Sequence, residues 1–217
     1  MATGAIGQTV DLRSRILNAA RQRFFDMGFF AATTRDIAAQ AGTSESGVFR
    51  LFGSKYELLM AVYDDCWHEV NVEIEKRSRE SETRDPRNQI LDTIRIVLSL
   101  YDEEPLLMTF IIMNTGNTDT LLLEKKETAI ITVENLRYIQ RLERLCERCV
   151  DRQLAIRGMT TAALREGLLG LVEGILLGWY LADRGAGKYP DKISLEEALG
   201  VVAALLYGGE PCDHSCT

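Results

Sequence analysis

The chain has 217 residues, 46% of them hydrophobic and 26% charged, which is ordinary for a globular protein with one large domain or two small ones. Only four prolines, long runs of helix formers and the lack of alternating β-branched segments predict an all-α fold and exclude a β-rich one. Five cysteines, an odd number, with no signal peptide ahead of them indicate a cytoplasmic protein with reduced thiols.

The net charge of −7 is divided unevenly along the chain. Residues 10–60 carry seven Lys or Arg against five Asp or Glu, so this segment is +2 and the rest of the chain is −9. A cationic segment on an acidic body is polarised in the direction that binding to DNA requires. An excess of two positive charges is small, so the charge distribution supports a DNA-binding motif but is not evidence for one by itself.

The N-terminal residues predict an arm followed by one amphipathic helix. Residues 1–9 have no charged side chain and two glycines, and we expect a flexible arm. Asp11 is placed to cap a helix over residues 12–27, whose apolar positions recur at steps of three and four. Gly28 can end that helix with a positive φ angle.

Residues 33–55 then predict two short helices joined by a tight turn. Thr33 is a good N-cap with Asp36 three residues on, and the first helix should end at Gly42. Ser44 is the N-cap of the second helix. A helix-turn-helix of this kind inserts its second helix into the DNA major groove, although the spacing alone would equally suit a helical hairpin inside a core.

The identities of the residues separate these two interpretations. The pattern consists of Gly28, Phe29, Ala31, Thr33, Arg35, Asp36, Ile37, Ala38, Ala41, Gly42 and Ser44, followed by Phe49, Phe52, Ser54, Lys55, Glu57 and Leu58. Over roughly residues 10–60 it closely resembles the N-terminal DNA-binding domain of the TetR family of bacterial transcriptional regulators. The chain departs from the family where Phe49 replaces a usual Tyr, and where Ser46 and Gly47 replace a usual Gly and a small or hydroxylated residue.

The resemblance implies a homodimeric, two-domain, all-helical regulator. Residues 10–60 would be the helix-turn-helix domain, residues 61–209 the effector-binding and dimerisation domain, and residues 210–217 a tail. We expect a repressor that a small apolar effector releases from a palindromic, double-stranded DNA operator. The expected DNA-binding residues are Thr33, Thr34, Arg35, Thr43, Ser44, Glu45, Ser46, Gly47, Phe49, Arg50 and Lys55.

Three of these residues have specific expected roles. Arg50 is the long cationic donor of the second helix, and we expect it to bind a guanine or a neighbouring phosphate. Glu45 would accept from a cytosine amino group or stabilise the start of the helix. Lys55 follows the N-cap Ser54, where free backbone N–H groups and the helix dipole favour a phosphate.

The rest of the chain predicts further helices over residues 90–100, 106–113, 120–156, 161–184 and 195–207. Several large apolar side chains in this region could enclose the effector: Trp67, Met108, Phe110, Met113 and Tyr138. The alternative for each is an ordinary role in the core.

Four glycines, Gly167, Gly170, Gly174 and Gly178, fall on one helical face by their spacing. They predict a close helix approach, either in the four-helix bundle of a dimer or within one subunit. Glu166 and Glu173 interrupt this helix, so we expect no membrane span.

Two cysteine motifs remain. Cys146 and Cys149 share one helical face and are interpreted as reduced cysteines, whereas Cys212, His214 and Cys216 could bind zinc or copper. We expect no metal, no cofactor and no catalytic residue, because the chain has two histidines, no Gly-rich phosphate loop and no nucleophile elbow. A helical carrier of lipid-like ligands and a metal or redox sensor that uses the C-terminal tail are the alternatives.

Overall fold

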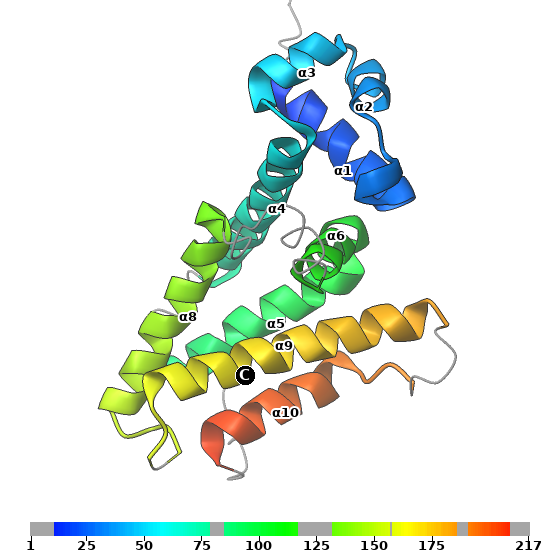
Figure 1. Cartoon of the computed structure of the whole chain (residues 1–217). Coiled ribbons are helices and arrows are strands. Elements are labelled where there is room, and N and C mark those ends of the chain that lie inside the picture. Colours follow the sequence, from blue (N-terminus) through cyan, green and yellow to red (C-terminus); the bar gives the residue numbers. More distant parts are fainter. Residues whose placement is uncertain (1–10, 79–84, 117–131, 157, 186–190, 209–217) are drawn as a thin grey trace, which may run out of the picture. The chain divides into compact units, whose positions relative to one another are not determined.

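The computed structural model describes residues 11–78, 85–116, 132–156, 158–185 and 191–208, and every regular element in these ranges is an α-helix. The predicted all-α fold is therefore confirmed. The chain divides into two compact units, residues 1–65 and 66–217. The boundary falls inside α4 (Lys55–Ser78), so one helix passes from the first unit into the second (Figure 1).

The first unit is built from α1 (Leu12–Ala31), α2 (Thr34–Gln40), α3 (Glu45–Phe52) and the beginning of α4. α2 packs against both α1 and α3. The apolar stripes of these helices meet in one small core, which contains Ile16, Leu17, Ala20, Phe24, Ile37, Ala38, Val48, Phe52, Leu58, Leu59 and Val62. This packing fixes α3 relative to α1, because an amphipathic helix can bury its apolar face in only one rotation about its axis.

α1 continues for one turn beyond its predicted end. Gly28 does leave helical geometry, at φ 77° and ψ 163°, but one more turn follows and the N–H of Ala32 donates to the Gly28 carbonyl at 3.1 Å. Aromatic packing accompanies the extra turn, since the ring centroid of Phe29 lies 5.6 Å from that of Phe24 and 5.4 Å from that of Phe30. Gly28 therefore ends the regular helix at Met27, as predicted, and the extra turn extends α1 to Ala31.

The second unit contains the rest of α4 and the helices α5 (Pro86–Glu103), α6 (Pro105–Gly116), α8 (Val133–Asp151), α9 (Thr161–Asp183) and α10 (Leu195–Tyr207). α5 packs against α6, α8, α9 and α10, and it is buried along much of its length. α9 in turn packs against α6, α8 and α10 (Figure 1). No helix among the described residues has the length and apolarity needed to cross a membrane.

The predicted continuous helix over residues 120–156 is wrong. Thr132 has extended geometry, and its side chain accepts a hydrogen bond from the N–H of Asn135, so α8 begins at Val133. α8 then stops at Asp151, and Gln153 adopts a φ of 57°. A β-branched residue that can cap with its hydroxyl competes with continued helix, which the apolar periodicity did not weigh.

Candidate functional site

The turn between α2 and α3 is closed by local hydrogen bonds. Gly42 has a φ of 68°, which lets the N–H of Thr43 turn back and donate to the carbonyl of Ala38 at 2.9 Å. Ser44 then caps α3, and its hydroxyl accepts from the N–H of Gly47 at 3.2 Å. The sequence predicted these capping contacts. The residues at the start of α3, Ser44, Glu45 and Ser46, are exposed.

α3 has one buried face and one exposed face. Gly47, Val48 and Phe52 point into the core, whereas Phe49 is 42% exposed. The remaining candidate residues of this surface divide by burial. Thr33, Arg35, Ser44, Glu45, Ser46 and Arg50 are exposed, Thr43 and Lys55 are half-buried, and Thr34 is buried.

Thr34 and Glu45 connect the two short helices. The Thr34 hydroxyl donates to the Glu45 carboxylate, which links the first turn of α2 to the first turn of α3. Glu45 also lies where the positive end of the α3 dipole stabilises a negative charge. Both contacts support a structural role for Glu45, and they hold the start of α3 at a fixed distance from α2.

Lys55 is held by the last turn of α1. Its Nζ atom donates to the carbonyl of Phe30 at 3.2 Å and lies 4.7 Å from the centre of the Phe29 ring. Burial lowers the pKa of Lys55 from its usual value. The ammonium group therefore helps to position α4 on α1.

Four arginines of the first unit fall into two groups. Arg13 stacks over the Phe52 ring at 5.6 Å, and Arg21 forms an ion pair with Asp65 at 3.1 Å, so both stabilise the packing of α1. Arg35 and Arg50 are exposed and form no ion pair with any residue that the structure describes. These two guanidinium groups, on α2 and α3, are available to a partner.

Comparison with known proteins places this unit in a family. Residues 16–62 match the family model of bacterial regulatory proteins, tetR family. Over these residues the chain matches the TetR family. Two curated relatives from Pseudomonas putida, the HTH-type transcriptional regulator TtgR and the probable HTH-type transcriptional regulator ArpR, are each 30% identical over 76 residues. That alignment spans 35% of this chain and only 36% of the length of each relative.

Solved structures extend the TetR fold over nearly the whole chain. The fatty acid degradation regulator FadR from Bacillus halodurans superimposes with a TM-score of 0.69 at 19% identity, covering 96% of this chain and 98% of that one. FadR from Bacillus subtilis, solved in complex with stearoyl-CoA, gives a TM-score of 0.71 at 16% identity, covering 90% of this chain and 98% of that one. At these identities the likeness shows the fold alone.

The second unit contains a buried aromatic pair. The Trp67 ring on α4 stacks on the Tyr138 ring of α8, with centroids 5.0 Å apart and planes at 27°. Tyr138 is 3% exposed, and its hydroxyl has no hydrogen-bond partner among the described residues. Burial raises the pKa of this phenol, and the charge of Glu173 on α9 raises it further.

The other predicted pocket residues lie on α6. Met108 and Phe110 are 1% and 2% exposed. Met113 belongs to the same helix, and its side chain lies outside the described part of the chain. Of the five predicted residues, Trp67 and Tyr138 are in direct ring contact.

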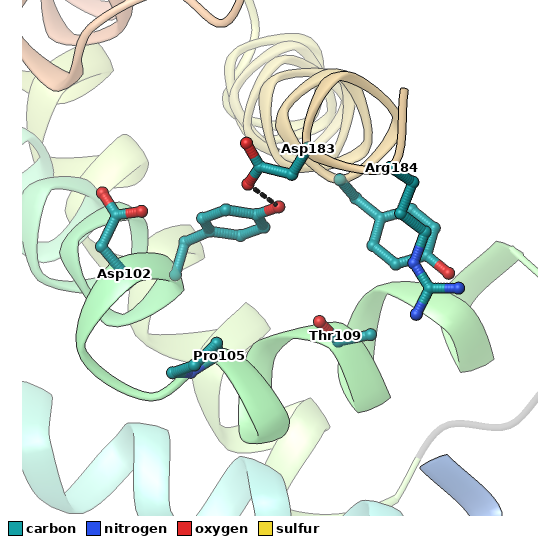
Figure 2. A pocket seen from close by; sticks show the side chains of 7 residues that line it. Asp102, Pro105, Thr109, Asp183 and Arg184 are labelled. Atoms are coloured by element: carbon teal, nitrogen blue, oxygen red, sulfur yellow. Dashed lines mark hydrogen bonds between the residues drawn. The ribbon is translucent and has the colours of Figure 1, made fainter. Parts of the chain in front are cut away.

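A different hollow, of about 240 Å³, opens where the end of α5, the beginning of α6 and the end of α9 meet (Figure 2). It is lined by Tyr101, Asp102, Pro105, Thr109, Tyr180, Asp183 and Arg184. No sequence pattern predicts this site. Its residues are ordinary helix-end residues separated by up to 83 positions, and no local pattern joins them.

The glycine face and the helical cysteines can also be placed. A methyl group built on Gly170, Gly174 or Gly178 would meet no described atom within 4 Å, so this face of α9 is not packed within the described part of the subunit. Cys146 and Cys149 are buried and unpaired. Burial raises the pKa of their thiols to about 12 and about 11, which makes them unreactive. The tail residues Cys212, His214 and Cys216 lie outside the described residues.

Proposed function

We propose that this protein is a ligand-responsive transcriptional regulator that binds double-stranded DNA as a homodimer, with α3 as its recognition helix. The observation that carries the proposal is the division of α3 into a buried face and an exposed face that carries Phe49 and Arg50. Arg35 on α2 adds a second exposed guanidinium group. In such dimers the recognition helices enter successive major grooves about 34 to 36 Å apart.

The polar atoms of the exposed face suit distinct contacts. Arg50 can donate two hydrogen bonds to a guanine, which is the commonest specific contact in the major groove. Ser44 and Ser46, whose hydroxyl oxygens are 2.9 Å apart, can donate to phosphates at the edge of the groove. Phe49 has no hydroxyl, and its exposed ring can make an apolar contact such as one with a thymine methyl group.

The uncovered glycine face of α9 supports a dimer through α9 and α10. Gly170 and Gly174 are exposed, and beside them Leu177 and Val201 leave 46% and 49% of their surface accessible. Small residues let two helix backbones approach closely, and the neighbouring aliphatic side chains supply apolar area. A second copy of the same face is the partner that fits, because a twofold interface joins identical surfaces.

The effector site is proposed in the core of the second unit, beside Trp67 and Tyr138. A buried hydroxyl without a partner costs free energy, and a ligand that supplies a hydrogen-bonding group would recover it. We therefore propose that the effector is a small, largely apolar molecule with one hydrogen-bonding group. An effector that favours one conformer would change operator affinity through a coupling of about 1 to 3 kcal/mol.

The decisive experiment is the selection of bound sites from random double-stranded DNA. The proposal predicts recovery of a near-palindromic site, bound by two subunits, with an affinity that falls steeply as salt rises. Recovery of no enriched sequence would favour the alternative of a helical ligand carrier in which residues 33–55 serve packing alone. Repression is then tested by placing the selected site over a reporter promoter, where a repressor lowers expression.

A further inference from the structure

The hollow at the end of α9 combines aromatic rings with carboxylates. Figure 2 shows Asp102 and Asp183 on opposite helices at its rim, with Thr109 and Pro105 on α6 below them. The Tyr101 hydroxyl donates to the Asp183 carboxylate at 2.8 Å, so this carboxylate and one ring are held in place by each other. Trp179 packs at the edge of the Tyr101 ring, with centroids 5.5 Å apart and planes at 63°.

An ammonium group from outside the lining of the hollow lies against Tyr101, Asp102 and Asp183. Lys192, in the segment before α10, places its Nζ atom 2.7 Å from Asp102 Oδ1 and 3.5 Å from Asp183 Oδ2. The same atom lies 4.5 Å from the centre of the Tyr101 ring and 5.2 Å from that of the Trp179 ring. Two carboxylates and two ring faces therefore converge on one cation, although the side chain of Lys192 remains 27% exposed.

We propose that this is a binding site for a small organic ammonium ion with an apolar body, and that Lys192 occupies it as a tethered ligand. Aromatic faces and carboxylates are the groups that recognise such cations. The rings do not depend on Lys192 for their positions, because Tyr101 and Trp179 are 6% and 2% exposed and pack against each other. The cage therefore persists when Lys192 leaves.

The size of the hollow and the charges around it bear on the size and charge of the ligand. A volume of about 240 Å³ next to the Lys192 contacts admits a compact apolar body. Arg184, which stacks over the Tyr180 ring at 4.6 Å, places a fixed positive charge on the other wall. A monocation is therefore preferred over a dication. This chemistry differs from that of the apolar site proposed beside Trp67 and Tyr138.

Displacement of Lys192 has a structural consequence. Lys192 is two residues before Ser194, the N-cap of α10, where Ser194 and Glu197 form a complete capping box. Loss of the Lys192 contacts would free the chain that leads into α10. An effect of amines on dimerisation or on operator affinity would follow only if the function proposed above is correct, so the test of the site itself uses binding alone.

The experiment titrates the full-length protein with 2-phenylethylamine and with its neutral analogue 2-phenylethanol, and measures heat and two-dimensional NMR shifts. In the Lys192→Met variant the tethered cation is absent, and we expect the amine to bind at least about tenfold more tightly than to the wild type, as for a site that Lys192 fills about nine-tenths of the time. The affinity for the alcohol should not change. Arg95→Met, which removes the cation of an exposed ion pair with Glu196, is the matched control and should leave amine binding unchanged.

Further variants separate the outcomes. Adding Asp183→Asn to Lys192→Met should remove most of the gain in amine affinity, because one carboxylate is lost while the Asn side chain can still accept from Tyr101. Thermal unfolding must first show that each variant is folded. Equal affinity of folded Lys192→Met for the amine and the alcohol, or equal amine affinity in the wild type and Lys192→Met, would overturn the proposal. Neither outcome bears on DNA binding, so the two proposals fail independently.

Discussion

Removing the hydroxyl of Tyr138 should not destabilise the protein. This hydroxyl is buried without a hydrogen-bond partner in the described part of the chain, and the desolvation cost of such a group is about 1 to 3 kcal/mol. Tyr138→Phe keeps the ring that stacks on Trp67 and removes the oxygen. In the absence of effector, the free energy of unfolding should therefore stay unchanged or rise by up to about 2 kcal/mol.

The matched control is Tyr101→Phe, in the same unit. Tyr101 is similarly buried, at 6% against 3% exposed, but its hydroxyl donates to the Asp183 carboxylate at 2.8 Å. A hydrogen bond to a charged group contributes about 1.5 to 3 kcal/mol, so this variant should lose stability. Both substitutions remove a tyrosine hydroxyl. The difference between their changes in the free energy of unfolding therefore shows the effect of having or lacking a hydrogen-bond partner.

Urea unfolding followed by tryptophan fluorescence measures both variants. The chain has two tryptophans, Trp67 and Trp179, and both belong to the second unit, so the signal reports that unit and not the DNA-binding unit. The urea midpoint should fall for Tyr101→Phe and should stay unchanged or rise for Tyr138→Phe. The slope of the free energy of unfolding against urea concentration should be the same for both variants and the wild type. If Tyr138→Phe is destabilised as much as Tyr101→Phe, the Tyr138 hydroxyl has a partner after all, and the reasoning that places a polar group of the effector there is wrong.

Four shorter predictions follow from other parts of the molecule. Arg50→Ala should remove about 1 to 3 kcal/mol of discrimination at one operator position, measured on a panel of single-base variants, whereas a uniform loss across the panel would assign Arg50 to a phosphate. Lys55→Ala should lower the slope of log K against log salt by about one, and an unchanged slope would leave Lys55 with only its contact to Phe30. Gly174→Leu should convert the proposed dimer to a folded monomer in sedimentation, because a Cβ atom added at Gly174 meets no described atom of its own subunit within 4 Å; a stable dimer would place the interface elsewhere. Cys146 and Cys149 should resist iodoacetamide at pH 8 until the protein unfolds, because a thiol of pKa about 11 is ionised in roughly one molecule in a thousand at that pH; peptide mass spectrometry would detect early labelling.

The sequence by itself determined the features that depend on contacts within about four residues. Thr33, Ser44 and Ser54 each accept a hydrogen bond from the N–H three residues on, as their positions predicted, and these caps define where α2, α3 and α4 begin. A cap is a local hydrogen bond between a side chain and its own helix, so the residue types and their spacing are sufficient to predict it. The two short helices were predictable for the same reason, whereas the family resemblance came from the identities of the residues at positions 28–58.

Tertiary structure alone decided which distant side chains meet. Lys192 and Asp102 are 90 positions apart, and the residues between them give no signal that an ammonium group, two carboxylates and two rings will converge. Likewise, apolar spacing assigned Tyr138 to a helix face, but only the packing of α8 against its neighbours left its hydroxyl buried without a partner among the described residues. Periodicity fixes which face of a helix is buried, whereas the partner of each atom on that face depends on how the helices cross, and that is set by the packing of the whole core.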